Sequence, residues 1–294
     1  MPILITPRPS NECEFTEWSI RDSERSQLVS ALAYLYIQQE ENALRVISEL
    51  EPKKRPPKGR IVDNVIAKLA GPKQIDLDLL HNGTPKEKDQ AKNRTRTAIW
   101  HRDGLLFQHL SWIVARRAAP QAYMTSPHVR QADKGFDGFI IEFDETHSRL
   151  ERIILCEDKA SEDPRPLITK SVWKEISEIR RGDRDDEILA DLTTLLKGVP
   201  DLDNEAKEEV VDAIFWENVR QFRVSVATSE DHRSADGFDH ILRGFETIAP
   251  GPITSRMGGV IAFGNVRQGL ENLAKEVAEK VREIAKLEDP SIVR

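Results

Sequence analysis

Three charged residues at the end of an apolar run are the strongest chemical signal in this sequence. The run Ile153-Ile154-Leu155 leads into Glu157, Asp158 and Lys159, and Asp137 opens an earlier apolar run. Two carboxylates can hold a hard cation such as Mg²⁺, which prefers oxygen ligands and keeps several waters. A lysine beside such a cation can orient a water or stabilise charge that develops on phosphorus. These residue types therefore predict metal-dependent hydrolysis of a phosphodiester.

The two apolar runs must pair for these residues to meet. We expect strands over Phe139–Phe143 and Leu150–Cys156, joined by a polar, turn-rich link. An antiparallel hairpin of this kind would bring Asp137 close to Glu157, with Lys159 beside them. The sequence thus predicts that both carboxylates and the lysine lie at one end of a sheet.

Side chains alternate along a strand, so Glu157 and Lys159 should share one face while Asp158 points to the other. The alternative is an ordinary ion pair between Glu157 and Lys159 on a solvated strand face. We favour the catalytic interpretation because a hairpin precedes the triplet and a helix follows it. Asp103, in the helix before the first strand, is a candidate for a fourth acid, and Glu142 is expected to face solvent.

Regular periodicity surrounds the hairpin. The expected helices are Ser23–Leu50, Val62–Leu69, Ile75–Leu80, Thr97–Ala119, Ile168–Ile179, Glu187–Leu196, Glu205–Val219 and Asn265–Leu287. Further strands are expected over Ala122–Val129, Phe222–Thr228 and Val260–Phe263. The pattern predicts an α/β fold with a mixed sheet. It divides into a mostly helical N-terminal region, residues 1–90, and a second region, residues 91–294, that ends in a long amphipathic helix. Four tryptophans are expected in the core: Trp100, Trp112, Trp173 and Trp216.

The order helix, three strands, helix, strand, with Asp137, Glu157 and Lys159 in a D-x19-E-x-K arrangement, resembles the PD-(D/E)XK nuclease superfamily. The resemblance covers about residues 95–230, and Phe136 stands in place of the leading proline of the family. It implies a restriction-endonuclease-like core that cleaves DNA with Mg²⁺, or with Mn²⁺ in its place. It also implies that Asp137 and Glu157 are metal ligands, that Asp158 adds a backbone carbonyl, and that Lys159 is catalytic.

The net charge limits which parts of such a protein could bind DNA. The 294 residues carry a formal charge of −7, which repels a polyanion as a whole. Contact with DNA must therefore come from local basic segments. Two segments qualify, Lys53–Arg60 with five cations and no anion, and Lys86–Arg102, where acids dilute the positive charge. The alternative for each segment is a solvated surface with no ligand.

The composition indicates the cellular compartment and argues against several other classes of enzyme. The two cysteines, Cys13 and Cys156, fit a reducing compartment, and no apolar run is long enough to cross a bilayer. We expect a cytoplasmic protein with no signal peptide and no membrane partner. The seven histidines form no HExxH pattern, and the sequence contains no GxSxG, GxGxxG or GxxxxGK[ST] motif. Without these motifs, nothing in the sequence supports a zinc protease, a serine hydrolase, a dinucleotide-binding protein or an ATPase.

The layout as a whole is similar to that of the nuclease subunits of Hachiman anti-phage systems. That resemblance implies a DNA-cleaving effector controlled by a helicase partner, and this chain carries no helicase motifs of its own. The helices near both ends of the chain would be docking surfaces. Two alternatives remain open: a stand-alone restriction or repair endonuclease, and a non-catalytic interaction subunit with a nuclease fold.

Overall fold

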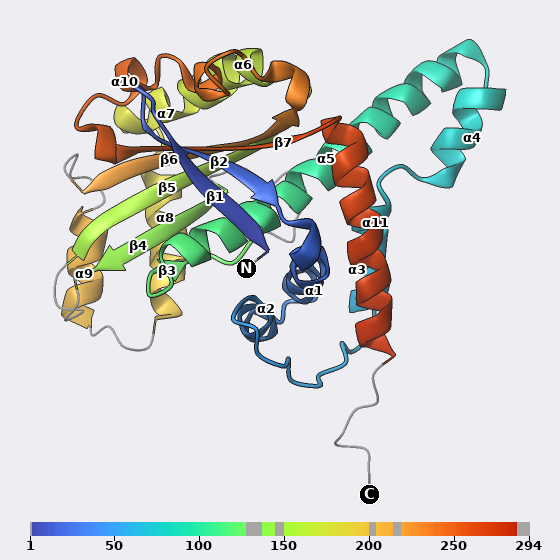
Figure 1. Ribbon diagram of the computed structural model, residues 1–294, viewed down its shortest axis with the longest axis horizontal. Helices are drawn as coiled ribbons and strands as arrows, with labels where there is room; N and C mark the ends of the chain where they lie inside the picture. Colours follow the sequence, from blue (N-terminus) through green and yellow to red (C-terminus); the bar gives the residue numbers. More distant parts are fainter. Residues whose placement is uncertain (1, 128–136, 145–149, 200–203, 214–218, 287–294) are drawn as a thin grey trace, which may run out of the picture.

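A mixed sheet of seven strands forms the centre of the computed structural model, which describes residues 2–127, 137–144, 150–199, 204–213 and 219–286 (Figure 1). The strand order is β1-β2-β7-β6-β5-β4-β3. The strands are β1 Ile3–Arg8, β2 Glu14–Ile20, β3 Tyr123–Met124, β4 Gly138–Phe143, β5 Leu150–Ala160, β6 Arg220–Ser229 and β7 Arg256–Phe263. The predicted α/β class with a mixed sheet is confirmed.

Helices cover both faces of this sheet (Figure 1). They are α1 Arg25–Tyr36, α2 Glu40–Ile47, α3 Ile61–Ala70, α4 Gln74–Asn82, α5 Pro85–Ala118, α6 Pro164–Leu167, α7 Trp173–Arg180, α8 Asp185–Lys197, α9 Asn204–Ala213, α10 Phe245–Ile248 and α11 Val266–Ala285. A π-helical turn, Ile168–Val172, joins α6 to α7. Short 3₁₀ turns occur at Asp22–Glu24, Glu230–His232, Asp239–Leu242 and Ile253–Ser255. The long C-terminal helix is confirmed as α11.

The middle of the sheet is parallel, because β2, β7, β6 and β5 run in one direction. The edges are antiparallel hairpins, β1 with β2 and β4 with β5, and β3 adds to β4. Central parallel strands are buried on both faces and therefore read as near-continuous apolar runs. β6 is buried on both faces, since nine of its ten residues are buried and one is partly buried, but its sequence RQFRVSVATS is not a continuous apolar run.

Each face of the sheet has its own core. On one face α1, α3, α5 and α11 pack together, and on the other α7, α8 and α10 cover β5, β6 and β7. The apolar stripe of α11 is buried in the first core through Val266, Leu270, Leu273, Val277, Val281 and Ile284. This stripe is intramolecular packing, so it offers no apolar surface to a partner.

The hairpin of β1 and β2 was not predicted from the sequence. These strands lie inside the segment expected to be mostly helical, and β2 pairs with β7 from the far end of the chain. The close approach depends on glycine, since a Cβ at Gly259 would lie 2.1 Å from the indole of Trp18. Pairing of this kind is set by contacts distant in sequence, so local periodicity could not reveal it.

Two helices differ in extent from the prediction. The helix expected over Ser23–Leu50 is broken between α1 and α2, where Gln38 adopts a left-handed φ of 60°. α5 begins twelve residues earlier than expected, at Pro85 rather than Thr97. A capping box explains this start: Glu87 N donates to the Thr84 hydroxyl, and Thr84 N donates to the Glu87 carboxylate at 2.8 Å.

The expectation for tryptophan is wrong at one position. Trp112 and Trp173 are buried, but Trp100 is 49% exposed on α5. The N-terminal part of α5 extends past the sheet (Figure 1), so helical spacing alone does not decide which of its faces is covered. Trp216 and Phe136 lie outside the described residues.

Candidate functional site

The β4–β5 hairpin forms as expected and brings Asp137 against β5. Gly138 pairs with Cys156, and just before it Asp137 N donates to the Cys156 carbonyl at 3.1 Å. The Asp137 carboxylate then accepts a hydrogen bond from the backbone N–H of Asp158 at 2.6 Å. Asp137 is therefore fixed beside the Glu157-Asp158-Lys159 triplet by two contacts to the backbone of β5.

Glu157 is a buried carboxylate, with only 3% of its surface exposed. Its Oε1 forms an ion pair with Lys159 Nζ, and its Oε2 is buried without a hydrogen-bond partner among the described residues. The Lys159 side chain is 25% exposed, so this ion pair is largely enclosed rather than displayed on a solvated face. The arrangement differs from the ordinary surface pair considered as the alternative.

The electrostatics of these groups follow from their burial and their neighbours. Burial raises the pKa of Glu157 well above its usual value, and the Asp137 carboxylate raises it further. Burial lowers the pKa of Lys159, but the carboxylates of Glu157 and Asp137 outweigh that effect and hold it above its usual value. Lys159 is thus an ammonium group, whereas Glu157 binds a proton more readily than an exposed glutamate does.

Asp158 points to the opposite face of β5, as the alternation of strand side chains predicts. There Ser111 of α5 donates its hydroxyl to Asp158 Oδ1 at 2.6 Å, and Arg223 of β6 donates to the Ser111 carbonyl at 3.2 Å. Burial raises the pKa of Asp158 to about 6, although Arg223 lowers it in part. The side chain of Asp158 therefore belongs to a buried polar network under α5.

The backbone of Asp158 faces Asp137. In a strand the N–H and C=O of one residue point to the same side, and the N–H of Asp158 already meets the Asp137 carboxylate. The Asp158 carbonyl is consequently directed to that same side, beyond Gly138, where β4 begins. This orientation is the one required of a backbone ligand beside Asp137.

Two further side chains that the sequence reasoning missed contribute to the site. Gln108 of α5 donates its amide to Asp137 Oδ1, opposite the contact from Asp158. Glu175 of α7 lies on the face of the sheet opposite α5. Its negative charge further raises the pKa of Glu157 and the pKa of Lys159. Glu175 follows the π-helical turn and accepts a hydrogen bond from Ser171 at 2.9 Å. No local sequence signal marks either residue, because both reach the site through tertiary packing.

The two spare acids are engaged elsewhere. The Asp103 carboxylate is fully buried and accepts hydrogen bonds from Arg102 at 2.9 Å and from Arg267 of α11 at 2.8 Å. It thereby ties α5 to α11, and the structure shows no contact between it and the Asp137 cluster. Glu142 forms an ion pair with Arg152 across the hairpin at 2.7 Å.

The donors of this cluster fit a magnesium ion that keeps much of its water. Within the described ranges, no group of three or more histidine, cysteine, aspartate or glutamate side chains is arranged to hold a metal. Two carboxylates and a carbonyl are present instead, and Glu157 Oε2 forms no hydrogen bond with the described residues. Mg²⁺ is commonly held by one or two carboxylates and several waters, so this oxygen set is sufficient.

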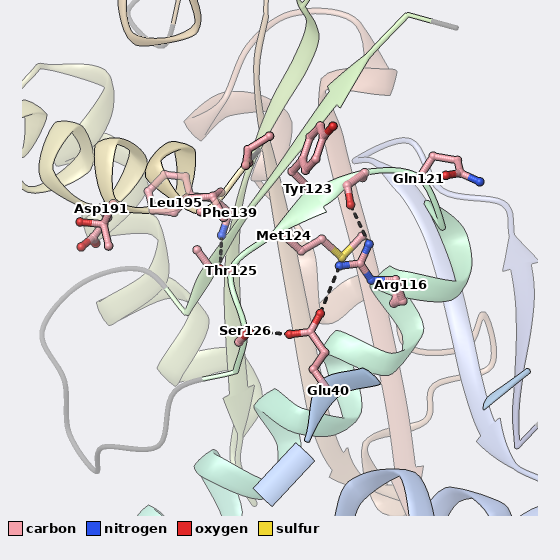
Figure 2. Close-up of a pocket in the computed structure, with 15 residues that line it drawn as sticks. Glu40, Arg116, Gln121, Tyr123, Met124, Thr125, Ser126, Phe139, Asp191 and Leu195 are labelled. Carbon is pink, nitrogen blue, oxygen red and sulfur yellow. Dashed lines mark hydrogen bonds and ion pairs between the residues drawn. The ribbon is translucent and has the colours of Figure 1, made fainter. Parts of the chain in front are cut away.

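A pocket of about 650 Å³ runs beside β3 and α8 (Figure 2). Within it Arg116 lies 3.7 Å from Glu40, and Ser126 donates to Glu40 at 2.6 Å. A much smaller cavity, about 20 Å³, borders Asp137, Asp158 and Gln108, and it shares Gly138 with the wider pocket. The candidate cluster therefore lies next to the wider pocket rather than inside it.

Comparison with family models, with curated proteins and with solved structures finds no match to this chain. Over the ranges that the structure describes, no helix is both long enough and apolar enough to cross a membrane.

Proposed function

We propose that this chain is a metal-dependent nuclease with a restriction-endonuclease-like core, and that Asp137, Glu157 and Lys159 hydrolyse phosphodiester bonds in DNA. The buried carboxylate of Glu157 is the observation that carries the proposal. One of its oxygens meets Lys159, and the other has no hydrogen-bond partner among the residues that the structure describes, although burying a carboxylate is costly unless its charge is compensated. A bound cation would compensate the charge on the second oxygen. An apolar residue of the same size would carry no charge and would need no cation.

Each residue then has a defined role. Asp137, Glu157 and the carbonyl of Asp158 would hold Mg²⁺, or Mn²⁺ in its place. The metal would activate water and neutralise charge on the phosphate. Gln108 and the Asp158 amide orient the Asp137 carboxylate from two sides. Lys159 carries a proton on Nζ, so it donates hydrogen bonds to a water or a phosphate oxygen rather than accepting a proton.

The same geometry supplies a restraint. Lys159 occupies one oxygen of Glu157, and a proton competes for the carboxylate because its pKa is raised. Both effects weaken metal binding in the isolated chain. We propose that the protein is a cytoplasmic anti-phage effector, similar to the HamA nuclease subunit of Hachiman systems, whose metal site is completed under the control of a helicase partner.

Plasmid cleavage tests this function. The purified protein is incubated with plasmid DNA and Mg²⁺, with and without a candidate helicase partner. The Glu157→Ala/Lys159→Ala double variant should be inactive. The matched control is Glu142→Ala/Arg152→Ala, which removes an ion pair from the same hairpin outside the site and should cut like the wild type.

Three outcomes would decide against parts of the proposal. Mg²⁺-dependent cutting by the Glu157→Ala/Lys159→Ala variant would show that the site is elsewhere. Full, unregulated cutting by the isolated chain would favour a stand-alone endonuclease. A folded wild-type chain that never cuts, with any partner, would favour a non-catalytic subunit.

A further inference from the structure

An arm projects from the body of the molecule, formed by α4 and the N-terminal part of α5 (Figure 1, right). α5 has 34 residues, which at about 1.5 Å per residue makes it about 50 Å long. Asp76 of α4 pairs with Arg94 of α5 at 2.7 Å, and Ala91 is fully buried within the arm. Together with the capping box at Thr84, these contacts define a structured arm with a fixed outer surface.

Every fourth residue of α5 belongs to one ridge, because residues four apart are neighbours on a helix, and this ridge winds around the helix by about 40° at each step. The ridge consists of Lys88, Lys92, Arg96, Trp100, Gly104 and Gln108. It begins with exposed cations on the arm and ends at the side chain that binds Asp137. The arm is thus continuous with the candidate site along one helix.

The outer half of the ridge presents free positive charge beside an exposed aromatic ring. Lys88, Lys92 and Arg96 are exposed and form no ion pair with the described residues; Arg96 donates only to the Asn93 side chain, at 3.0 Å. The Arg96 guanidinium lies 5.0 Å from the ring centre of Trp100, which is 49% exposed. Asp89 is the acid closest to this row on the same helix, so positive charge predominates.

The inner half of the ridge is open. A Cβ added at Gly104 would meet no atom of the described residues within 4 Å, so these residues leave space beside the helix at this position, between Trp100 and Gln108. Eight residues separate those two side chains, about 12 Å along the axis. At about 3.4 Å per nucleotide of a stacked strand, this distance corresponds to three or four nucleotides.

We infer that the ridge binds a single strand of DNA and guides it toward Asp137. Proteins that bind single strands combine a basic track with an aromatic ring on which a base stacks, and the ridge has both elements. A duplex would hide its base faces from Trp100. A protein partner would meet the exposed lysines Lys88 and Lys92, and lysine is depleted at protein interfaces. This inference rests on the proposed function and adds a substrate class to it.

Binding without metal tests the inference separately from cleavage. Fluorescence anisotropy of a labelled single-stranded oligonucleotide is measured in EDTA, where no Mg²⁺ supports cutting. We expect Trp100→Ala to weaken binding about tenfold or more, and Trp100→Phe to restore most of it, because phenylalanine keeps a stacking face. Lys92→Ala/Arg96→Ala should reduce the slope of log affinity against log salt by about 1.4, for two lost phosphate contacts.

The control variant is Arg181→Ala/Lys197→Ala, which removes the same charge from exposed positions beside and on α8. It should leave affinity and salt slope close to the wild type. Equal weakening by this control would show that only net charge matters and would overturn the inference. So would preferential binding of a duplex that Trp100→Ala does not weaken, or an effect of Trp100→Ala on a protein partner alone.

The two proposals fail in different ways. If the wild type binds single strands through Trp100 but never cuts, the ridge stands and the nuclease proposal fails. If the wild type cuts and the ridge variants bind and cut equally well, the nuclease stands and the ridge fails. Unchanged thermal midpoints of the ridge variants would confirm that they are folded.

Discussion

The carboxylate of Asp137 accepts a hydrogen bond from the backbone N–H of Asp158 at 2.6 Å, and this contact joins the two strands of the hairpin at the candidate site. The Asp137 carboxylate is thereby held by the backbone of β5, the strand that carries Glu157. The spacing between Asp137 and Glu157 therefore depends on strand pairing rather than on flexible side chains.

Glu157 should be required for metal binding. With Mg²⁺ or Mn²⁺ at about one hundred times its Kd, the wild type should gain about 2–3 kcal/mol of stability, seen as a higher thermal midpoint. Glu157→Gln should lose this gain, since an amide is a far weaker ligand. Glu142→Gln on the same hairpin should keep it. An equal metal-induced shift in Glu157→Gln would place the cation elsewhere.

Lys159 and Glu157 should be coupled in stability. Lys159→Met leaves a buried carboxylate without its ionic partner, and we expect a loss of about 3 kcal/mol at pH 8. The loss should shrink as the pH is lowered toward 5, because the raised pKa of Glu157 favours uptake of a proton by its carboxylate. The Glu157→Gln/Lys159→Met double variant should recover most of it. Urea unfolding of the four proteins in this cycle measures the coupling.

The surface pair on the hairpin provides the comparison for that cycle. Glu142 and Arg152 are more exposed, so their coupling should be about 1 kcal/mol or less at either pH. A coupling for Glu157 and Lys159 as small as this one would contradict the enclosed ion pair.

Asp158 should make the stability of the protein depend on pH. Its pKa is raised from an ordinary value near 4 to about 6, so the folded state binds the proton more tightly than the unfolded state. The free energy of unfolding should therefore fall as the pH rises from about 4 to about 6. The contribution is on the order of 2–3 kcal/mol. Denaturation of wild type and Asp158→Asn across this range isolates it, since the difference between them should change with pH by that amount.

Gln108 should position Asp137 without contacting substrate. Gln108→Ala removes the amide that binds Asp137 Oδ1, and we expect the Mg²⁺ concentration for half-maximal cleavage to rise about tenfold or more. Gln90→Ala, an exposed change on the same helix, is the matched control. If the cleavage rate at saturating Mg²⁺ recovers in Gln108→Ala, the residue acts through the metal site. An unchanged Mg²⁺ requirement would contradict that role.

Local pattern was sufficient for the hairpin and for the faces of β5. Strand alternation placed Glu157 and Lys159 on one face and Asp158 on the other, and the apolar runs fixed which strands pair. These features depend on residues within about 25 positions of one another. They could therefore be predicted from the sequence alone.

Features made by distant segments could not be predicted in this way. Gln108, Glu175 and Arg223 reach the hairpin from other elements, and nothing in their own neighbourhoods indicates a target. Trp100 has the helical spacing of a core residue, but whether a helix face is covered depends on where the sheet ends. The pairing of β2 with β7 is the extreme case, because the partners lie more than 240 positions apart.

That pairing has a consequence for synthesis of the chain. Glu14 aligns with Met257 and Trp18 with Ile261, so the β1–β2 hairpin has no place in the sheet until the last strand has left the ribosome. Until then β6, next to the strand that carries Glu157 and Lys159, remains an open edge. A chain interrupted before residue 256 would hold all the proposed catalytic residues without a completed sheet. Completion of the sheet therefore depends on synthesis of β7.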